Sequence, residues 1–383
     1  MNAPMPLEED TPPRPTKERI RSLDALRGFD MFWIIGGDLI GRSLPKVADT
    51  PFTRLVAGQL EHPLWNGFTF YDVIFPLFFF IIGAVFPFSL FRRADRGQNR
   101  MRLYLHIVRR SLVLIALGLL VGGVLAFDFS NLRWTGVLQR IGLCYLLVSL
   151  LVLNTRPRAQ AALFAATLVL YWAAMMLVPV PGFGAGNLTP EGNLHSYVDQ
   201  QILGKWMHSR FPPRFYGFGD SAGVLGTFPS ACSMLLGVFA GTWLKSEHTS
   251  RWKMNRLLLS AAACLGSGYL WGMIFPINKH IWNSPYVLWA GGWCFLLMAL
   301  FYWIIDVKGY TRWAFFFSVI GMNAIFIYVS QQIVDFHKIA AFFLGGVAAH
   351  AGTWEPLILP CGILTVKWLL LLFLYKKGIF FKV

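Results

Sequence analysis

Long apolar segments alternate with short polar connections along most of the chain. Nine segments reach the length of about 20 residues that a helix needs to cross a bilayer. They lie near residues 70–91, 106–127, 135–154, 161–179, 223–244, 257–275, 285–305, 314–336 and 356–375. A tenth segment, 23–41, is weaker because Asp30 and Asp38 interrupt its apolar part. The pattern predicts an all-α polytopic membrane protein with about ten transmembrane helices.

Basic residues are divided unequally between the two sides that these segments define. If residues 23–41 cross the membrane, 23 of the 34 Lys and Arg residues fall on one side and nine on the other, while Arg140 and Lys367 fall within spans. Cytoplasmic connections usually carry the excess of basic residues, so both termini are predicted to be cytoplasmic. The connections predicted to face outward are 42–69, 180–222, 276–284 and 337–355.

Composition supports a membrane protein and argues against a nucleic-acid-binding protein. The chain is 56% hydrophobic and 14% charged, whereas soluble domains carry about 25% charged residues. Its net charge of +15 comes from basic residues placed between apolar segments and not from one basic face. Neither the five cysteines nor the eight histidines have the spacing of metal ligands, so no metal site is predicted.

The chain divides into a polar tail and one apolar domain. Residues 1–22 are proline-rich and charged, a composition typical of a disordered segment. Residues 23–383 are predicted to form a single membrane domain. Its longest connection, 180–222, carries several aromatic side chains. Because connections of this length are usually functional or disordered, these aromatic residues favour an ordered lid.

The most informative polar residue is His62, which precedes the apolar run that begins at Phe68. Ionisable groups at the edge of a span are costly and are often kept for chemistry, and the pKa of histidine suits proton transfer near neutrality. Asp38 closes the preceding weak segment. Consecutive spans are usually neighbours, so its carboxylate could fix the tautomer of the histidine. The alternatives are a histidine that caps a loop and an aspartate that only faces water.

Several short motifs resemble those of one family, in order along the chain. Ser22-Leu23-Asp24-Ala25-Leu26-Arg27-Gly28-Phe29 resembles the opening signature of the transmembrane acyltransferases. His62-Pro63-Leu64-Trp65-Asn66-Gly67 and Asp72-Val73-Ile74-Phe75-Pro76 resemble the segment around the catalytic histidine of the heparan-α-glucosaminide N-acetyltransferase family. Further blocks follow at 136–142, 177–182, 223–227, 276–279, 306–309 and 321–323. Together they extend from about residue 19 to the C-terminus.

The resemblance implies an acetyl-CoA-dependent N-acetyltransferase. The family takes acetyl from cytosolic acetyl-CoA and delivers it across the membrane to the amino group of a terminal glucosamine. The lumenal domain and leading helix of the animal members are missing, which suggests a bacterial inner-membrane protein. Animal members also carry asparagine where this chain has Asp38, and a bacterial relative need not meet heparan. The expected partners are membrane lipid, an amino-sugar acceptor and a second copy of the chain in a homodimer.

N-acetylation of an amine requires a base, donors for the oxyanion and cations for the anionic cofactor. The resemblance makes His62 the base or a transient acetyl carrier. We expect Asp38 to be its partner, and Asn66 could be an oxyanion donor or a turn residue. Asp72 could cap a helix or act in catalysis. The residues expected to bind acetyl-CoA are Arg140, Gln139, Arg27 and Asn323, and those expected to bind the acceptor are Asp220, Asn278 and Lys279.

Structural alternatives remain for several of these residues. Arg140 lies inside a span and needs an anionic partner, which could be an acid such as Asp220 instead of a CoA phosphate. Arg27 could pair only with Asp24, one turn earlier. Asn323 could hydrogen-bond between helices.

Two other classes of protein compete with an acetyltransferase. A transporter of a small solute could also have ten spans with polar residues near the midplane, although no internal repeat is evident. A structural scaffold would leave His62, Asp38 and Arg140 unexplained.

Overall fold

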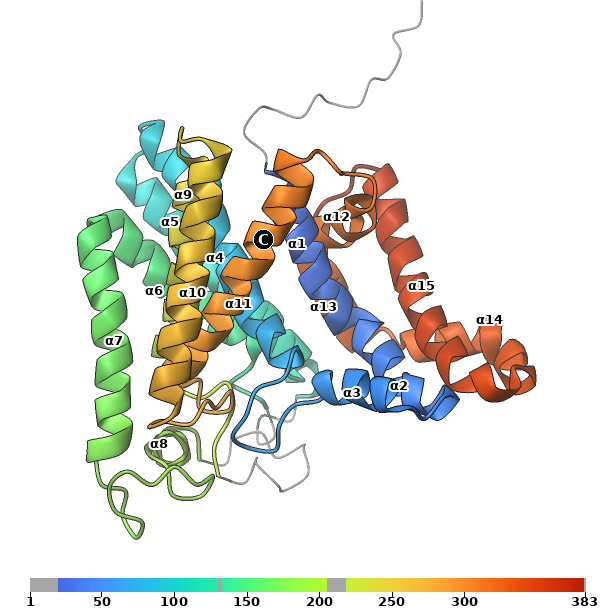
Figure 1. The fold of residues 1–383 in the computed structure, drawn as a ribbon, viewed down its shortest axis with the longest axis horizontal. Helices are drawn as coiled ribbons and strands as arrows, with labels where there is room; N and C mark the ends of the chain where they lie inside the picture. The colour runs from blue at the N-terminus through green and yellow to red at the C-terminus, as the bar shows by residue number, and fades with distance from the viewer. Residues whose placement is uncertain (1–19, 128, 130–131, 205–217, 382–383) are drawn as a thin grey trace, which may run out of the picture.

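The computed structural model describes residues 20–127, 129, 132–204 and 218–381, and all of its regular elements there are helices. Most long helices run side by side, and α2, α3 and α14 lie across their lower ends (Figure 1). In chain order the helices are α1 (Arg21–Phe32), η1 (Trp33–Gly37), α2 (Asp38–Val47), α3 (Pro51–Gln59), α4 (Tyr71–Asp95), α5 (Arg100–Val121), η2 (Val124–Ala126), α6 (Val137–Asn154), α7 (Pro157–Leu177), α8 (Leu194–Leu203), α9 (Thr227–Lys245), α10 (Ser250–Gly272), α11 (Ser284–Phe301), η4 (Tyr302–Val307), α12 (Ala314–Met322), α13 (Ala324–Ile333), α14 (Phe336–His350), η5 (Gly352–Trp354) and α15 (Glu355–Lys376).

The prediction of an all-α polytopic membrane protein is confirmed. Within the described part of the chain, seven helices are long and apolar enough to span a membrane, and the bent pair α12 and α13 makes an eighth candidate. These eight coincide with predicted spans. The other two predicted spans, 23–41 and 257–275, fold as α1 with its continuation and as α10, which are shorter or less apolar. The total of about ten spans therefore stays a prediction.

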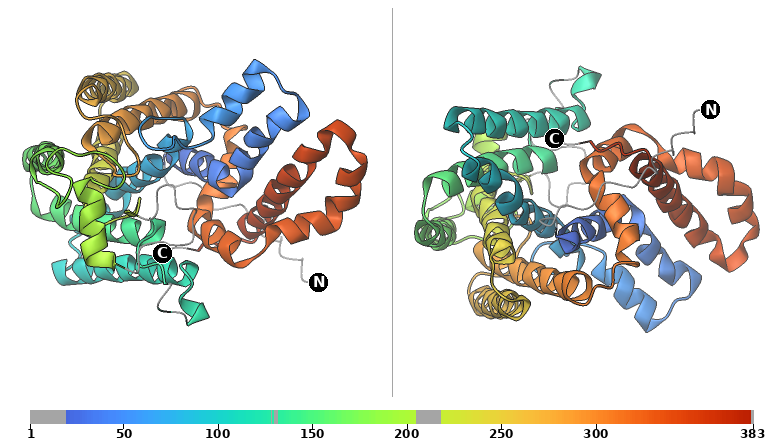
Figure 2. Two further views of the ribbon diagram at one scale, coloured as in Figure 1. Left: turned by 90° about the horizontal axis from the view of Figure 1, so that it is seen from below. Right: turned by 90° about the horizontal axis from the view of Figure 1, so that it is seen from above.

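The first predicted span does not continue as one straight helix. A π-helical turn, η1, follows α1, and Gly36 within it adopts a φ of 149°, which glycine reaches without the steric cost that a Cβ would add. Beyond this bend, α2 and α3 form a hairpin that projects from the same side of the molecule as the α14–α15 hairpin (Figure 2). The bend determines where Asp38, the first residue of α2, lies.

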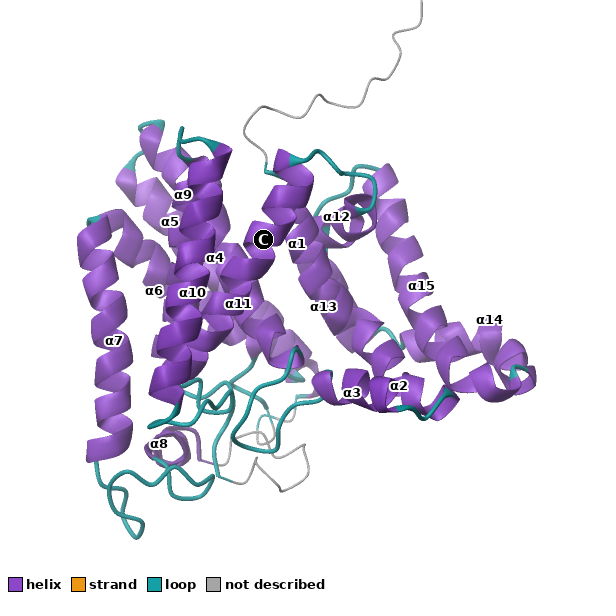
Figure 3. Cartoon of the chain, viewed as in Figure 1, coloured by secondary structure: helices purple, strands orange, loops and turns teal. Residues whose placement is uncertain are grey.

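Several connections contain more regular structure than the sequence predicted. The predicted outward connection 337–355 is mostly α14, which packs against α15, so its prediction as a loop was wrong. The connection 180–222 contains α8, while its residues 205–217 lie outside the described part of the chain. Residues 1–19 of the predicted tail also lie outside it, and α1 begins at Arg21. The longer loops gather at the lower end of the bundle (Figure 3).

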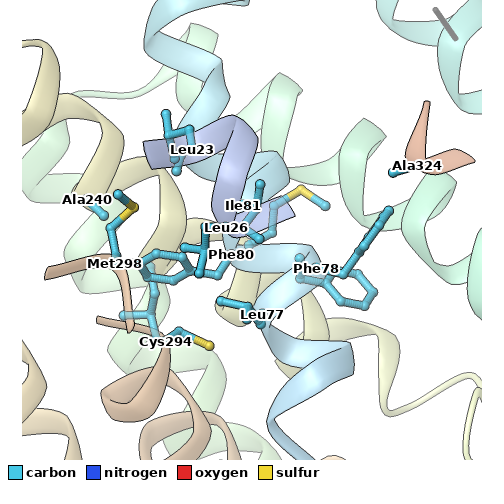
Figure 4. Close-up of a cluster of buried hydrophobic side chains, with 14 of the residues drawn as sticks. Leu23, Leu26, Leu77, Phe78, Phe80, Ile81, Ala240, Cys294, Met298 and Ala324 are labelled. Carbon is cyan, nitrogen blue, oxygen red and sulfur yellow. The ribbon is translucent and has the colours of Figure 1, made fainter. Parts of the chain in front are cut away.

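Helix α4 forms the centre of the core. Figure 4 shows its Leu77 and Phe80 near Leu26 of α1 and Met298 of α11, and all four side chains are buried. The contact between α4 and α9 is close because it uses small residues, as helix pairs in membranes commonly do. A Cβ on Gly237 of α9 would collide with the carbonyl oxygen of Phe80.

The described ends of the chain meet at the upper end of the bundle. Asp24 and Arg27 of α1 line the same cavity as Phe380 and Phe381, which follow α15. The placement of both termini on the cytoplasmic side stays a prediction drawn from the basic residues.

Candidate active site

Three ionisable side chains meet at the lower end of the bundle. Nδ1 of His62, in the loop between α3 and α4, lies 2.7 Å from Oδ1 of Asp72 in the first turn of α4. Nζ of Lys279, in the loop between α10 and α11, lies 2.7 Å from Nε2 of His62 and 3.5 Å from Oδ1 of Asp72. Asp72 is fully buried. With Nδ1 protonated, the ring donates to Asp72. Nζ of Lys279 lies 3.0 Å from Nδ1 as well as 2.7 Å from Nε2, so the ammonium group lies over the ring and not along the lone pair of Nε2.

Two loops hold this cluster together. The backbone N–H of Gly67 donates to the carbonyl of Ile277 at 2.9 Å, and Gly67 has a φ of 131°. One residue away, the side-chain amide of Asn278 donates to the side-chain oxygen of Asn66 at 3.0 Å. Asn66 therefore closes the contact between the loops, which is the turn role, and Asn278 positions Lys279 beside His62.

Asp72 fastens the start of α4 and also contacts His62. Its Oδ2 accepts from the backbone N–H of Thr69, two residues before the helix begins, at 3.0 Å. Its other oxygen holds the ring of His62. The carboxylate is thus fixed by the helix terminus before it orients the histidine.

The predicted pairing of Asp38 with His62 is corrected by the structure. The carboxylate on the histidine belongs to Asp72, whereas Asp38 pairs with Arg42 at 3.3 Å and hydrogen-bonds to the side chain of Tyr71. Tyr71 lies between the two groups, with its ring centroid 5.0 Å from that of His62. The bend at Gly36 carries α2 away along the membrane edge, so Asp38 reaches Tyr71 and not the histidine.

The surroundings of the cluster shift two pKa values. Burial lowers the pKa of His62, and the positive charge of Lys279 lowers it further, while the hydrogen bond to Asp72 opposes both effects. Burial also lowers the pKa of Lys279 to about 8, against the attraction of Asp72. At neutral pH the histidine is therefore mostly neutral, as a base or nucleophile must be.

Two adjoining cavities lie between this cluster and the upper end of the bundle. A cavity of 190 Å³ is lined by His62, Tyr71 and Lys279. A second cavity, of 580 Å³, opens toward the start of α1 and shares Phe78, Ile141 and Ile325 with the first. Along α4 the lining extends from Tyr71 to Arg93, which is about 33 Å at 1.5 Å per residue. The two cavities together therefore extend over about the thickness of a bilayer's apolar core.

The upper cavity is basic. It is lined by Arg27, Arg93, His106 and Arg110, together with Asp24, which pairs with Arg27 at 3.9 Å. Of its three arginines the sequence selected Arg27 alone. Arg93 and Arg110 belong to the basic connection that was used only to orient the chain. His106 and Arg110 are four residues apart on α5 and so share one helix face.

Two residues expected to bind acetyl-CoA lie elsewhere. Arg140 is fully buried, donates to the carbonyl of Gly223 at 2.9 Å and lies over the ring of Trp282. Gln139 lines a different cavity, of 470 Å³. Neither residue lines the two cavities that join His62 to the basic end. Arg140 instead connects α6 to the segment before α9.

Asn323 and Asp220 also hold the fold together. Asn323, at the 68° break between α12 and α13, donates to the carbonyl of Ile379 and accepts from the N–H of Phe381. It thereby anchors the C-terminal segment that lines the basic cavity. Asp220 is fully buried, accepts from Thr135 and pairs with Arg133 at 3.5 Å. It stabilises the long lower connection and lies outside the His62 cluster.

The fold and the site define a class of protein. It is an integral membrane protein with a basic cavity at one end and a histidine–carboxylate–lysine cluster at the other, and the cavity that contains this cluster adjoins the basic one. Within that class, the chain belongs to the family of the heparan-α-glucosaminide N-acetyltransferase catalytic domain, whose profile matches residues 19–271. Membership agrees with the resemblance seen in the sequence motifs.

Two curated relatives show how far the likeness extends. The chain is 27% identical to heparan-α-glucosaminide N-acetyltransferase of Mus musculus over 446 aligned residues and 26% identical to that of Homo sapiens over 427. The alignments cover 99% and 95% of this chain. The chain spans 63% and 60% of the length of the two relatives.

Proposed function

We propose that the protein is a transmembrane acetyltransferase that takes acetyl from cytosolic acetyl-CoA and delivers it to an amino sugar on the extracytoplasmic side. The observation that carries this proposal is the pair of adjoining cavities, which joins a cluster of cations to a neutral histidine. The excess of basic residues at the cavity's upper end supports a cytoplasmic orientation for that end.

Acetyl-CoA matches the two ends of this path. Its phosphates are anionic, and Arg27, Arg93 and Arg110 supply cations at the upper end. Arginine is well suited to phosphate because its planar fork donates two hydrogen bonds at once. The narrow middle, lined by Phe78 and Ile141, accommodates the slender arm that carries the thioester. This assignment replaces the predicted contacts of Arg140 and Gln139 with CoA.

His62 supplies the chemistry at the lower end. As a general base, its Nε2 takes a proton from the acceptor amine while the amine nitrogen attacks the thioester carbonyl. The C–S bond then breaks, and CoA leaves as the thiolate. As an acetyl carrier, Nε2 itself attacks the carbonyl and CoA leaves as the thiolate. The amine nitrogen then attacks the acetyl group on the ring, the Nε2–C bond breaks, and the freed Nε2 takes the proton that the amine loses. Both routes require the Nε2 lone pair and an ionised Asp72 on Nδ1.

Lys279 has a defined part in either route. Its ammonium group lies over the ring of His62, 2.7 Å from Nε2 and 3.0 Å from Nδ1. It is therefore beside the nitrogen at which the acceptor amine or the thioester carbon must arrive, close enough to stabilise the negative charge that develops on the carbonyl oxygen. We therefore assign Lys279 to the catalytic cluster, and Asn278 and Asn66 to its support.

Release of CoA thiol by the purified protein tests the proposal. Acetyl-CoA is supplied with a panel of amino sugars, and acetylated products are identified by mass. His62→Ala should abolish transfer, because loss of a general base typically costs about a hundred- to ten-thousand-fold in rate. The matched control is His337→Ala, an exposed histidine on α14, which should keep full activity.

The same preparation distinguishes an enzyme from a transporter. Reconstituted protein that moves a solute without releasing CoA thiol would overturn the proposal and favour a transporter. Full activity in His62→Ala would leave the acetyltransferase standing but would remove His62 from its mechanism.

A further inference from the structure

A third cavity, of 640 Å³, lies outside the path from the basic end to His62. It is on the other side of the start of α4. Phe70 and Val73 line this third cavity, whereas Tyr71 and Ile74 line the cavity that contains His62. Its other lining comes from α10 and α11, from the loop between them and from the segment before α4. We refer to it as the α10–α11 groove.

The groove is elongated along α11 and faces the bilayer. Trp289, Trp293 and Leu297 line it at intervals of four residues, so they form one stripe about 12 Å long. Tyr269 in the last turn of α10 and Met273 just after that helix line it too, and both are exposed on the surface of the bundle. Because an exposed apolar side chain in a membrane bundle contacts lipid, the groove is open to the hydrocarbon of the membrane.

The lower end of the groove adjoins the candidate active site. Gln59 lines the groove and precedes His62 by three residues, so their Cα atoms are at most about 11 Å apart. Gly67 and Ile277 also line this end. These two residues join the loops that carry His62 and Lys279, so one pair of loops borders both spaces.

We propose that the α10–α11 groove binds the hydrocarbon chain of a lipid-linked acceptor, whose amino-sugar head group thereby reaches His62. This inference rests on the acetyltransferase proposed above and names the class of its acceptor. An apolar stripe that ends beside the site fits a chain in the membrane with its polar head at the water interface. A free sugar would leave the groove without a function in the reaction.

A series of alkyl glucosaminides tests the proposal, because its members share one head group and differ in chain length. The methyl compound needs only the His62 site, whereas a hexadecyl chain also occupies the groove. We expect kcat/KM for acetyl transfer to rise at least tenfold from the methyl to the hexadecyl compound. Equal kcat/KM values would overturn the groove assignment and leave the enzyme intact. Failure of every compound, with no CoA release, would instead overturn the proposed function.

Leu297→Trp separates binding in the groove from simple partition into detergent. The larger ring fills the end of the groove that is farthest from His62. The ratio of kcat/KM for the hexadecyl compound to kcat/KM for the methyl compound should therefore fall at least fivefold, while kcat/KM for the methyl compound stays unchanged. Leu300→Trp, three residues further along α11 and outside the groove lining, should keep the advantage. An advantage that survives Leu297→Trp in full would overturn the proposal.

A second measurement does not depend on activity. A hexadecyl glucosaminide with a photoreactive group near the end of its chain should label α10 and α11 at the groove lining, and unlabelled hexadecyl glucosaminide should prevent this labelling. Equal protection by a phospholipid without a sugar would show a general lipid site and overturn the assignment to the acceptor.

Discussion

The charge of Lys279 should set the acidic limit of the reaction, and Lys279→Gln tests this. The ammonium group lies 2.7 Å from Nε2 of His62 and, after burial, contributes to the lowered pKa of that histidine. Transfer requires neutral His62, which predominates above its pKa. Removal of the positive charge raises this pKa, so the acidic limb of the rate profile should move to higher pH.

The size of the shift follows from the contact distance. At 2.7 Å, two unit charges interact by about 1.5 kcal/mol at the dielectric constant of water and by about 6 kcal/mol at an effective value of 20. The side chain of His62 is 37% exposed, so solvent screening favours the lower figure. One pKa unit corresponds to about 1.4 kcal/mol. We therefore expect a shift of about one unit, which makes transfer about tenfold slower relative to the plateau at pH values well below the pKa of His62 in both proteins.

The assay is kcat/KM for acetyl transfer between pH 4.5 and 8, normalised to each variant's own plateau. Lys279→Arg keeps a positive charge and should leave the limb close to its original position. Lys338→Gln, a control on an exposed lysine of α14, should leave it unchanged. Asp72→Asn should move the limb the opposite way, because the hydrogen bond to Asp72 raises the pKa of His62. An acidic limb that stays in place or moves down in Lys279→Gln would refute this reasoning.

Three further predictions concern the cofactor path and the packing of the bundle. Arg110→Ala should raise the KM for acetyl-CoA at least tenfold, since a hydrogen bond to a charged group contributes about 1.5–3 kcal/mol. The control is the neighbouring Arg109→Ala, which lies outside the cavity lining and should leave the KM unchanged. Equal KM values for the two variants would exclude Arg110 from phosphate binding. Arg140→Ala should lower the thermal unfolding temperature, because Arg140 donates a hydrogen bond to Gly223. The folded variant should still bind acetyl-CoA normally, because Arg140 does not line the two cavities between His62 and the basic end. Weakened acetyl-CoA binding by the folded variant in a titration would assign Arg140 to the cofactor site after all. Gly237→Val should destabilise the protein by about 3 kcal/mol through overpacking against α4. Gly266→Val should destabilise it far less, because a Cβ at this position meets no atom within 4 Å. Equal unfolding temperatures for the two variants would contradict the close packing of α4 on α9.

The sequence was sufficient for the class of protein and for most of its spans. Hydropathy is a local property, so eight of the ten predicted spans could be read from runs of apolar residues without knowledge of their neighbours. His62 could also be selected locally, because a histidine at the edge of a span is unusual and its surrounding motif is specific. The whole-chain likeness to known relatives agrees with these local signals.

Tertiary structure decided which polar residues meet. The sequence selected Asp38 as the partner of His62 and left Asp72 as a helix cap or a catalytic residue. Only the bend at Gly36 and the loop before α4 give the histidine its contact to Asp72. Arg140 had the composition of a phosphate ligand, but its rotation on α6 directs it to Gly223. Contacts between residues far apart in the chain depend on helix rotation, on bends and on the paths of loops. A one-dimensional pattern does not contain these quantities, and for that reason the cluster of His62, Asp72 and Lys279 emerged only from the folded chain.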